Sequence, residues 1–462
     1  MRTVLSVDQL GGIDPNTDAE RMTVRVVRSP FNVQKAHVAR EFKLTFDQLP
    51  AWGSPNAVME RGKKVRDSLC AHPGVESVLK QLCLTPPSQI QPLYIMLSES
   101  DAELISWETL CDANNTFIAL DQRWPIGRIS DPVSGQSRPP AELQLPVRIM
   151  ALISAFGIKG QTKEWEILRD AALAARAAGL QLILKLMVGE PNLRTAIDQE
   201  IANGLTGVEI APIDRTPSRV VQEIIAWSPH ILHFFCHGRA DLTDQSVELA
   251  TAGDYADPIT TAGSVRIGTQ QLVAMSTQLS NPWLLALNCC SSGQAAKNLQ
   301  SMAHQVVSAG FPAAVAMLEP VDANDAHEFT RAFYRSLFIT LTRAAKALNG
   351  GATRVAFEWT EAMYNARRAI CDLHNGDAPN AREWALPVLY VRGVEPFQFE
   401  QPHAEPEGEA NSYKTRVQLV AEWLNTAGRN ESEEKRRRVI EKVLADVPRS
   451  FWPSVDGTFG NL

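Results

Sequence analysis

The chain carries near its middle the stretch Ile231-Leu232-His233-Phe234-Phe235-Cys236-His237-Gly238, an apolar run that ends in His-Gly. A second stretch, Trp283-Leu-Leu-Ala-Leu-Asn-Cys-Cys-Ser-Ser-Gly293, is an apolar run that ends in cysteines and small residues. Each pattern predicts a buried strand that stops at a group capable of catalysis. A histidine at one strand end and a thiol at the next is how an α/β sheet brings a base to a nucleophile. The two stretches therefore indicate acyl transfer by a cysteine.

Strand and helix patterns alternate on both sides of these stretches. Apolar runs predict strands at 147–154, 180–188, 231–236, 283–289, 313–318 and 384–391, and helical spacing predicts helices at 163–178, 217–227, 324–348 and 352–372. We expect Gly179 to cap the first of these helices at its C-terminus. The alternation predicts an α/β fold, a mostly parallel sheet with helices on both faces and with its active groups at the carboxyl ends of strands. His237 and Cys290 both occupy such ends.

The sequence pattern divides the chain into four parts. These are an N-terminal mixed α/β lobe at 1–145, the domain with the alternating pattern at 146–395, an acidic, proline-containing linker at 396–412 and a short helical C-terminal tail at 413–462. Within the lobe, alternation predicts strands at 22–27, 93–97 and 117–120, and 57–84 shows helical spacing.

Composition excludes several classes of protein. The 462 residues are 45% hydrophobic and 21% charged, as in an ordinary globular protein, and the net charge of −7 argues against a nucleic-acid partner. The one cationic cluster, at 435–438, has glutamates around it and is typical of a charged helix face. No apolar run could span a bilayer and no signal peptide is visible, so no membrane association is expected. The seven cysteines fit no disulfide framework, which predicts a cytoplasmic protein with reduced thiols.

Cys290 is the expected nucleophile. Strand alternation places Cys289 on the opposite face, and the last residue of a strand, where the turn begins, is better exposed for attack. The Ser-Ser-Gly that follows leaves backbone N–H groups free at a helix start, where they can lower a thiol pKa and stabilise an oxyanion. Gly238 permits close backbone approach, and its N–H is a natural oxyanion donor. The alternative is that Cys290 is a small buried hydrophobe and His237 a hydrogen-bonded strand end.

Competing chemistries have weaker support. Cys236, His237, Cys289 and Cys290 offer four soft ligands, but they lack the spacing usual in zinc sites. No Walker-type glycine loop or dinucleotide fingerprint is present. Neither a metal nor a cofactor is therefore expected.

These residues resemble the CHAT family of caspase-like cysteine peptidases, which belong with caspases and separases, over residues 20–395. His237-Gly238 is similar to the family's histidine motif, and Leu287-Asn-Cys-Cys-Ser-Ser-Gly293 to its Leu-Asn-Ala-Cys-x-Ser-Gly pattern, with Cys289 in place of alanine. Further matches lie at 310–317, Phe329, Phe333-Tyr334 and 384–387. Ser106-Trp107-Glu108 resembles the family's Pro-Trp-Glu and is expected to be structural.

The resemblance implies a cysteine endopeptidase with a His–Cys dyad. His237 would act as general base and then as acid to the leaving amine. Cys290 would form a thioester acyl-enzyme, and the backbone N–H groups of Gly238 and Cys290 would hold the oxyanion.

The resemblance also implies a pocket for the residue that precedes the scissile bond. Asn288, two residues before the nucleophile, would line it. Relatives that cut after basic residues use an acidic pocket group, and the candidates here are Glu319, Asp322 and Asp325. The same acids could equally be helix N-terminal residues that interact with the helix dipole.

Family members commonly act in bacterial conflict systems. The resemblance implies a regulated effector in defence or cell death that cleaves a protein substrate, such as a gasdermin-like or another operon-encoded protein. The tetratricopeptide sensor of many relatives is absent from this sequence, so we expect a separate activating protein or ligand. The tail after Ser412 is the candidate docking element, unless it packs on its own domain, and 239–267 corresponds to the unformed loops of inactive caspase relatives. The alternative function is a catalytically silent caspase-like scaffold that binds signalling partners.

Overall fold

The computed structural model contains two compact units, Met1–Gln401 and Pro402–Leu462. The residues that it describes are 1–13, 20–33, 36–44, 49–86, 89–97, 101–130, 140–154, 156–157, 160–240, 245–257, 263–290, 299–319, 321–402, 416–420, 423, 432, 435–436, 440, 442–444 and 447.

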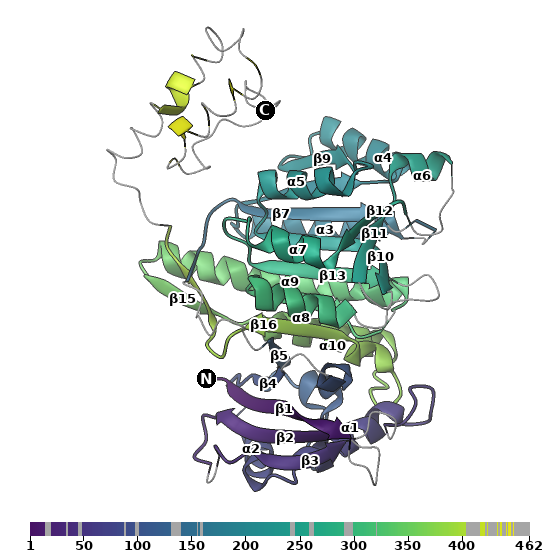
Figure 1. Ribbon diagram of the computed structural model, residues 1–462, viewed down its shortest axis with the longest axis vertical. Coiled ribbons are helices and arrows are strands. Elements are labelled where there is room, and N and C mark those ends of the chain that lie inside the picture. Colours follow the sequence, from purple (N-terminus) through teal and green to yellow (C-terminus); the bar gives the residue numbers. More distant parts are fainter. Residues whose placement is uncertain are drawn as a thin grey trace. The chain divides into compact units, whose positions relative to one another are not determined.

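The first unit is built on one large sheet (Figure 1), which fourteen strands form within the described residues. Its main path runs β3 (Arg40–Leu44), β2 (Glu20–Arg28), β1 (Thr3–Ile13), β4 (Leu93–Leu97), β5 (Ile126–Ser130), β16 (Pro387–Arg392), β14 (Ala313–Met317), β13 (Leu284–Cys290), β10 (Ile231–Ala240), β7 (Val147–Ser154), β8 (Leu182–Val188) and β9 (Val208–Pro212). β11 (Gln245–Leu249) and β12 (Val265–Gly268) extend it from the end of β10. Along the main path, only β3–β2, β2–β1 and β16–β14 are antiparallel. The predicted mostly parallel sheet is confirmed.

Helices cover both faces of this sheet (Figure 1). α3, α9 and α10 pack on one another on one face, and α5, α7 and α8 lie on the other. The helices are α1 (Ala57–Leu69), α2 (Pro73–Cys83), α3 (Gln161–Ala177), α4 (Pro191–Ala202), α5 (Pro217–Trp227), α6 (Ala252–Ala256), α7 (Thr269–Ser276), α8 (Leu299–Ala309), α9 (Ala323–Asn349) and α10 (Thr360–Leu373). Because both faces are covered, the central strands are buried along their length. This burial explains why they form nearly continuous apolar runs in the sequence.

Several predicted elements agree closely with the structure. β4, β7 and α5 have the predicted bounds. Gly179 follows α3 with φ of +94°, so the predicted glycine cap is confirmed.

In two segments the observed secondary structure differs from the predicted one. Residues 117–120, predicted as a strand, form the 3₁₀ turn Ile118–Leu120, because a short apolar run fits a buried turn as well as a strand. Residues 352–372, predicted as one helix, begin with β15 (Arg354–Phe357), and α10 follows from Thr360. β15 belongs to a second sheet, in which it pairs with β17 (Phe397–Glu400), itself beside β6 (Ala141–Glu142). A partner so distant in the chain leaves no local pattern.

The segment Trp107–Thr109 is a buried 3₁₀ turn whose Glu108 connects β5 to α10. Glu108 accepts hydrogen bonds from Nε and Nη2 of Arg128, on β5, at 2.9 and 2.7 Å. Arg367 of α10 lies 3.8 Å from the same carboxylate. These contacts agree with the structural role expected of the Ser106-Trp107-Glu108 motif. Since β5 pairs with β16, residues on both sides of the predicted boundary at 145 share one sheet.

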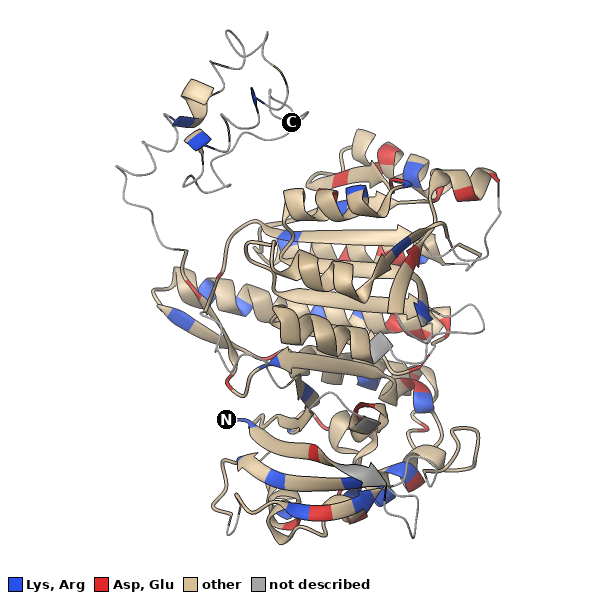
Figure 2. Cartoon of the chain, viewed as in Figure 1, with Lys and Arg blue, Asp and Glu red and all other residues tan. Residues whose placement is uncertain are grey.

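Basic and acidic residues are interspersed over the first unit (Figure 2). On β2 and β3, for example, Arg21 pairs with Glu41 at 2.7 Å. None of the helices in the described part of the chain is long and apolar enough to cross a membrane. In the second unit, Val420, Ile440, Leu444 and Val447 form a small apolar cluster. Much of the predicted tail lies outside the described residues.

Candidate active site

β10 and β13 lie side by side, and their register brings the two predicted catalytic residues together. The strands are parallel, with Cys236 opposite Cys289 and His237 opposite Cys290. Backbones of neighbouring strands are about 4.8 Å apart. The register therefore places His237 and Cys290 side by side, toward the carboxyl ends of the two strands. The side chain of Cys290 and residues 291–298 lie outside the described residues.

His237 is buried and has a defined tautomer. It is 1% exposed, and its Nε2 lies 2.5 Å from the carbonyl oxygen of Phe156, which follows β7. Because a carbonyl only accepts, Nε2 carries the proton and donates it, and Nδ1 holds the lone pair. Nδ1 has no partner among the described residues. The imidazole is therefore oriented by one backbone oxygen.

The described residues after Gly238 form strands and a short helix, where the family resemblance implied an unformed loop. β10 continues to Ala240 and pairs with β11, with Gly238 opposite Val247, and β11 pairs with β12. Within 239–267, Val247, Leu249 and Val265 are fully buried. The period-2 spacing of these residues is the signal that could have predicted the two strands. Residues 241–244 and 258–262 lie outside the described residues.

Cys236 and Cys289 are both fully buried, as predicted, with their sulfurs 3.7 Å apart. They pack beneath the sheet edge that carries His237 and Cys290. In the described part of the chain, no group of three or more His, Cys, Asp or Glu side chains is arranged to hold a metal ion.

A buried carboxylate, that of Glu164 on α3, links the elements that carry the site. It accepts hydrogen bonds from His233 of β10 at 2.9 Å, from His327 of α9 at 2.8 Å and from Thr330 of α9 at 2.7 Å. Complete burial alone would raise the pKa of Glu164, but the interactions with His233 and His327 outweigh this effect and hold it at about 2. Glu164 is therefore an ionised group inside the protein.

Asn288 belongs to the same network. It is 1% exposed, and its amide nitrogen donates to Thr330 Oγ1 at 2.8 Å and to the carbonyl of Ala326 at 3.1 Å. The structure thus places Asn288 against the start of α9, and it is not among the residues that line the pocket described next. Its predicted role as a pocket residue stays a prediction.

The three predicted acidic residues have different surroundings. Glu319 accepts from Trp52 Nε1 at 2.7 Å and pairs with Arg382 at 2.9 Å. Asp322 is exposed and caps α9, accepting from Asn324 N at 2.8 Å. Asp325 is buried and pairs with His374 at 2.7 Å. Burial raises the pKa of Asp325, and the hydrogen bond from His374 opposes that rise.

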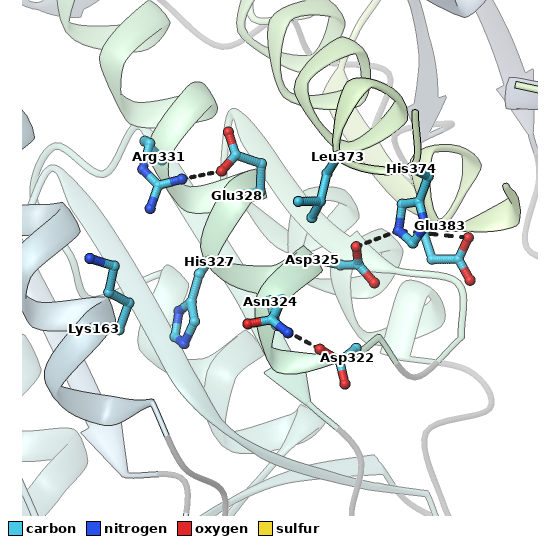
Figure 3. A pocket seen from close by; sticks show the side chains of 10 residues that line it. All are labelled: Lys163, Asp322, Asn324, Asp325, His327, Glu328, Arg331, Leu373, His374 and Glu383. Carbon is cyan, nitrogen blue, oxygen red and sulfur yellow. Dashed lines mark hydrogen bonds and ion pairs between the residues drawn. The ribbon is translucent and has the colours of Figure 1, made fainter. Parts of the chain in front are cut away.

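A pocket of about 470 Å³ lies at the start of α9, and Asp322 and Asp325 both line it (Figure 3). Its other acids are Glu328 and Glu383, and its lysine and arginine are Lys163 and Arg331. Glu319 is not among the lining residues. The structure therefore brings two of the three predicted acids to one pocket and separates the third.

Glu164, His327 and Thr330 were not predicted from the sequence. One signal was available for Glu164. It lies four residues before Leu168 and next to Trp165, so it shares the apolar face of α3. An acid on such a face needs a buried partner, and His233, the polar residue inside the apolar run 231–236, is one.

The chain is similar to a known family and, more remotely, to two solved structures. A family model described as the CHAT domain matches residues 68–356. Among solved structures, the chain is similar to chains of two crystal structures of the Saccharomyces cerevisiae separase–securin complex. In the structure at 2.6 Å the identity is 13%, the match covers 72% of this chain and 17% of that chain, and the TM-score is 0.35. In the structure at 3.0 Å these values are 10%, 86%, 30% and 0.39. This chain spans less than a third of either chain. No curated protein matches its sequence.

Proposed function

Because the chain belongs to the CHAT domain family of caspase-like peptidases, we propose that it is a cysteine endopeptidase with a dyad of His237 and Cys290. One observation carries the proposal: the parallel register of β10 and β13 sets these two residues opposite each other at the carboxyl edge of the sheet. Catalytic groups of α/β sheets collect at this edge.

The hydrogen bond from His237 Nε2 to the carbonyl of Phe156 supports separate roles for the two ring nitrogens. Nδ1, which holds the lone pair, takes the proton of the Cys290 thiol as the sulfur attacks the scissile carbonyl. The resulting imidazolium, stabilised by the Phe156 oxygen, gives its proton to the leaving amine and leaves a thioester on Cys290. Water then hydrolyses the thioester with His237 again as the base. The backbone N–H groups of Gly238 and Cys290 serve as oxyanion donors.

The pocket of Figure 3 is the proposed site for the residue that precedes the scissile bond. It lies at the start of α9, where His327 stacks on Phe235 of β10 and the carbonyl of Ala326 accepts a hydrogen bond from Asn288 of β13. Its four acids, Asp322, Asp325, Glu328 and Glu383, outnumber Lys163 and Arg331, which favours a lysine or arginine side chain. Asp325 is engaged by His374, and Glu319 by Arg382 outside the pocket. Glu328 is engaged by Arg331, and Glu383 lies 3.7 Å from Arg382. We therefore assign the recognition of the substrate's positive charge to Asp322, and Asn288, which bonds to the start of α9, stays a proposed pocket residue.

Asp322→Asn tests this assignment with little structural cost. Asparagine is as good an N-cap as aspartate, so α9 keeps its cap, and the stability should change by less than about 1 kcal/mol. We expect the rate of cleavage after lysine or arginine to fall about tenfold or more, since a hydrogen-bonded charge contact contributes roughly 1.5–3 kcal/mol. The measurement is kcat/KM for peptide reporters that differ only in this residue. An unchanged preference for basic residues would contradict the assignment.

We base the proposed biological role on the roles that are common among members of the family. We propose a regulated effector of a bacterial defence or cell-death system, acting in the cytoplasm on a partner protein such as a gasdermin-like or operon-encoded protein. An activating protein or ligand would release it, with the tail after Ser412 as the docking element.

Co-expression with neighbouring gene products tests the activity. We expect a neighbour to be cleaved by the wild type and by Cys289→Ala, and to stay intact with Cys290→Ala or His237→Ala. Gels and mass spectrometry of the fragments would give the substrate and the cut site. Cleavage that survives Cys290→Ala would refute the dyad. If no variant cleaves a neighbour and Cys290 also reacts with alkylating probes no faster than a free thiol, the silent scaffold is the correct function.

A further inference from the structure

The proposed general base depends on one backbone oxygen. His237 Nε2 donates to the carbonyl of Phe156, and this bond selects the tautomer that leaves Nδ1 as the base. A rotation of the peptide between Phe156 and Gly157 would remove the acceptor. Any group that fixes this peptide therefore also fixes the orientation of His237.

Two features fix the peptide. Gly157 has φ of +77°, a left-handed conformation that glycine adopts without strain. The ring of Phe156 packs edge to face against the ring of Tyr255, with centroids 4.9 Å apart and planes at 84°. This is the preferred geometry of an aromatic pair. The turn at Gly157 constrains the backbone after Phe156, and the contact with Tyr255 constrains the side chain of Phe156.

Tyr255 is itself held at the carboxyl end of β7. It lies on α6, in the segment between β11 and β12, and Nε2 of Gln161, at the start of α3, donates to its hydroxyl at 2.8 Å. The segment is fixed to β7 by Ser154, whose hydroxyl accepts from Ala250 N at 2.6 Å and donates to Ala250 O at 2.8 Å. Tyr255 is thus anchored to the strand that leads into Phe156.

We propose that Tyr255 is a positioning residue for the general base, acting through Phe156 on His237. This inference rests on the proposed dyad and adds to it a role for the segment between β10 and β13. Tyr255 contacts Phe156, whose carbonyl orients the imidazole. Loss of its ring frees Phe156 to turn, so that His237 samples orientations in which Nδ1 no longer serves the thiol. A ring that served packing alone would affect stability and leave the base unchanged.

The pH dependence of Cys290 alkylation separates these roles. Iodoacetamide reacts with the thiolate, so its rate against pH reports how well His237 takes the thiol proton. The rate at Cys290 is followed in the full chain by mass spectrometry of its peptide. Burial raises the pKa of Tyr255 to about 12, so the tyrosine itself does not titrate in the range measured.

Four variants form the test. Tyr255→Leu removes the ring, and we expect alkylation at neutral pH to slow about tenfold as the profile moves toward that of a free thiol, whose pKa is about 8.5. Tyr255→Phe keeps the ring and should stay within about twofold of the wild type. Gly157→Ala keeps every ring contact but strains the peptide, and should act like Tyr255→Leu even if the latter fails to fold. Phe397→Leu removes a similar ring pair with Phe399, at 4.9 Å, in the second sheet, and should lower the melting temperature alone.

The possible outcomes are distinguishable. If Tyr255→Leu and Phe397→Leu both lower the melting temperature and leave the alkylation profile unchanged, Tyr255 is a packing residue and the inference is wrong while the dyad stands. If His237→Ala also leaves the profile unchanged, the dyad is wrong and the inference falls with it. Nitrogen-15 NMR of the histidine rings gives a second readout, because the Nε2–H tautomer of His237 should be lost in Tyr255→Leu and kept in Tyr255→Phe.

Discussion

The carboxylate of Glu164 makes hydrogen bonds to several of the elements that form the site. It is completely buried, yet four donors from β10, β13 and α9 surround it, among them His233, His327 and Thr330. A buried carboxylate is stable only with such partners. Because β10 carries His237, β13 ends at Cys290 and α9 begins at the pocket, the carboxylate joins the parts that must stay in register for the proposed reaction.

The low pKa of Glu164 predicts how stability depends on pH. The folded protein lowers this pKa from 4.5 to about 2, so the folded state binds the proton more weakly than the unfolded chain. The stability that it contributes, on the order of 3 kcal/mol, is present above pH 4.5 and is lost as pH falls toward 2. We expect Glu164→Gln to lower the free energy of unfolding by about this amount at pH 7, with the gap to wild type narrowing below pH 4.5.

Urea unfolding of both proteins at pH values from 7 down to 3.5 measures this gap. Glu166→Gln, on the same helix, is the matched control because Glu166 is partly exposed and pairs with Lys163. The difference between its free energy of unfolding and that of the wild type should stay within about 1 kcal/mol at every pH. A Glu164→Gln gap that is constant with pH would show that the carboxylate is not specially stabilised in the folded state.

At this scale the sequence singles out the candidate residues and little of their surroundings. His237, Gly238 and Cys290 stand out because they follow apolar runs, although β10 itself continues to Ala240. The burial of Cys236 and Cys289 also follows from strand alternation. Phe156 could not be predicted, because its contribution is a backbone oxygen, which every residue has. The different surroundings of Glu319 and Asp325 depend on Arg382 and His374, which lie more than forty residues away.

At the scale of elements, the 3₁₀ turn Trp107–Thr109 connects β5 to α10 through buried charges. Glu108 and Arg128 are both fully buried, and the carboxylate also faces Arg367. Burial and the nearby Arg128 hold the pKa of Arg367 at about 10, whereas Glu108 raises it. Removal of the carboxylate would therefore leave two buried guanidinium groups without their counter-charge.

We expect Glu108→Gln to lower the free energy of unfolding by about 3–5 kcal/mol, the usual cost of breaking a buried ion pair. The exposed pair of Arg21 and Glu41 offers the control, since Glu41→Gln should cost about 1 kcal/mol or less. Chemical denaturation at pH 7 compares the two variants. Equal effects would mean that the buried pair contributes no more than a surface pair.

Elements with a strong local pattern were predicted well. β7 and β4 are short apolar strands, and α5 starts with a proline at its first turn, which marks its boundary. Of the elements that were missed, β15 depends on a distant partner, β17, so its pairing could not be inferred from neighbouring residues. β11 pairs with the nearby end of β10, and its period-2 spacing is a local signal that could have predicted it.

At the scale of the whole molecule, the continuous sheet predicts that residues 1–401 unfold as one unit. β5 of the N-terminal part pairs with β16 of the C-terminal part. The buried guanidinium of Arg367 donates to the carbonyls of Ile126, on β5, and Pro387, on β16, at 2.8 and 2.9 Å. A fragment of residues 146–401 would lose β5, expose the edge of β16 and leave Arg367 without one of these acceptors. We therefore expect 1–401 to fold with a single thermal transition and 146–401 to remain unfolded.

Calorimetry and circular dichroism of the full chain, of 1–401 and of 146–401 test this prediction, and with it the predicted domain boundary at 145. The full chain is the control for removal of the second unit, which should leave the main transition of 1–401 in place because the two units are separately compact. Two transitions in 1–401, or a folded 146–401, would mean that the N-terminal lobe is an independent domain. A single transition would mean that a partner binding to the lobe can alter the stability of the strands that carry His237 and Cys290, since both belong to one cooperative sheet.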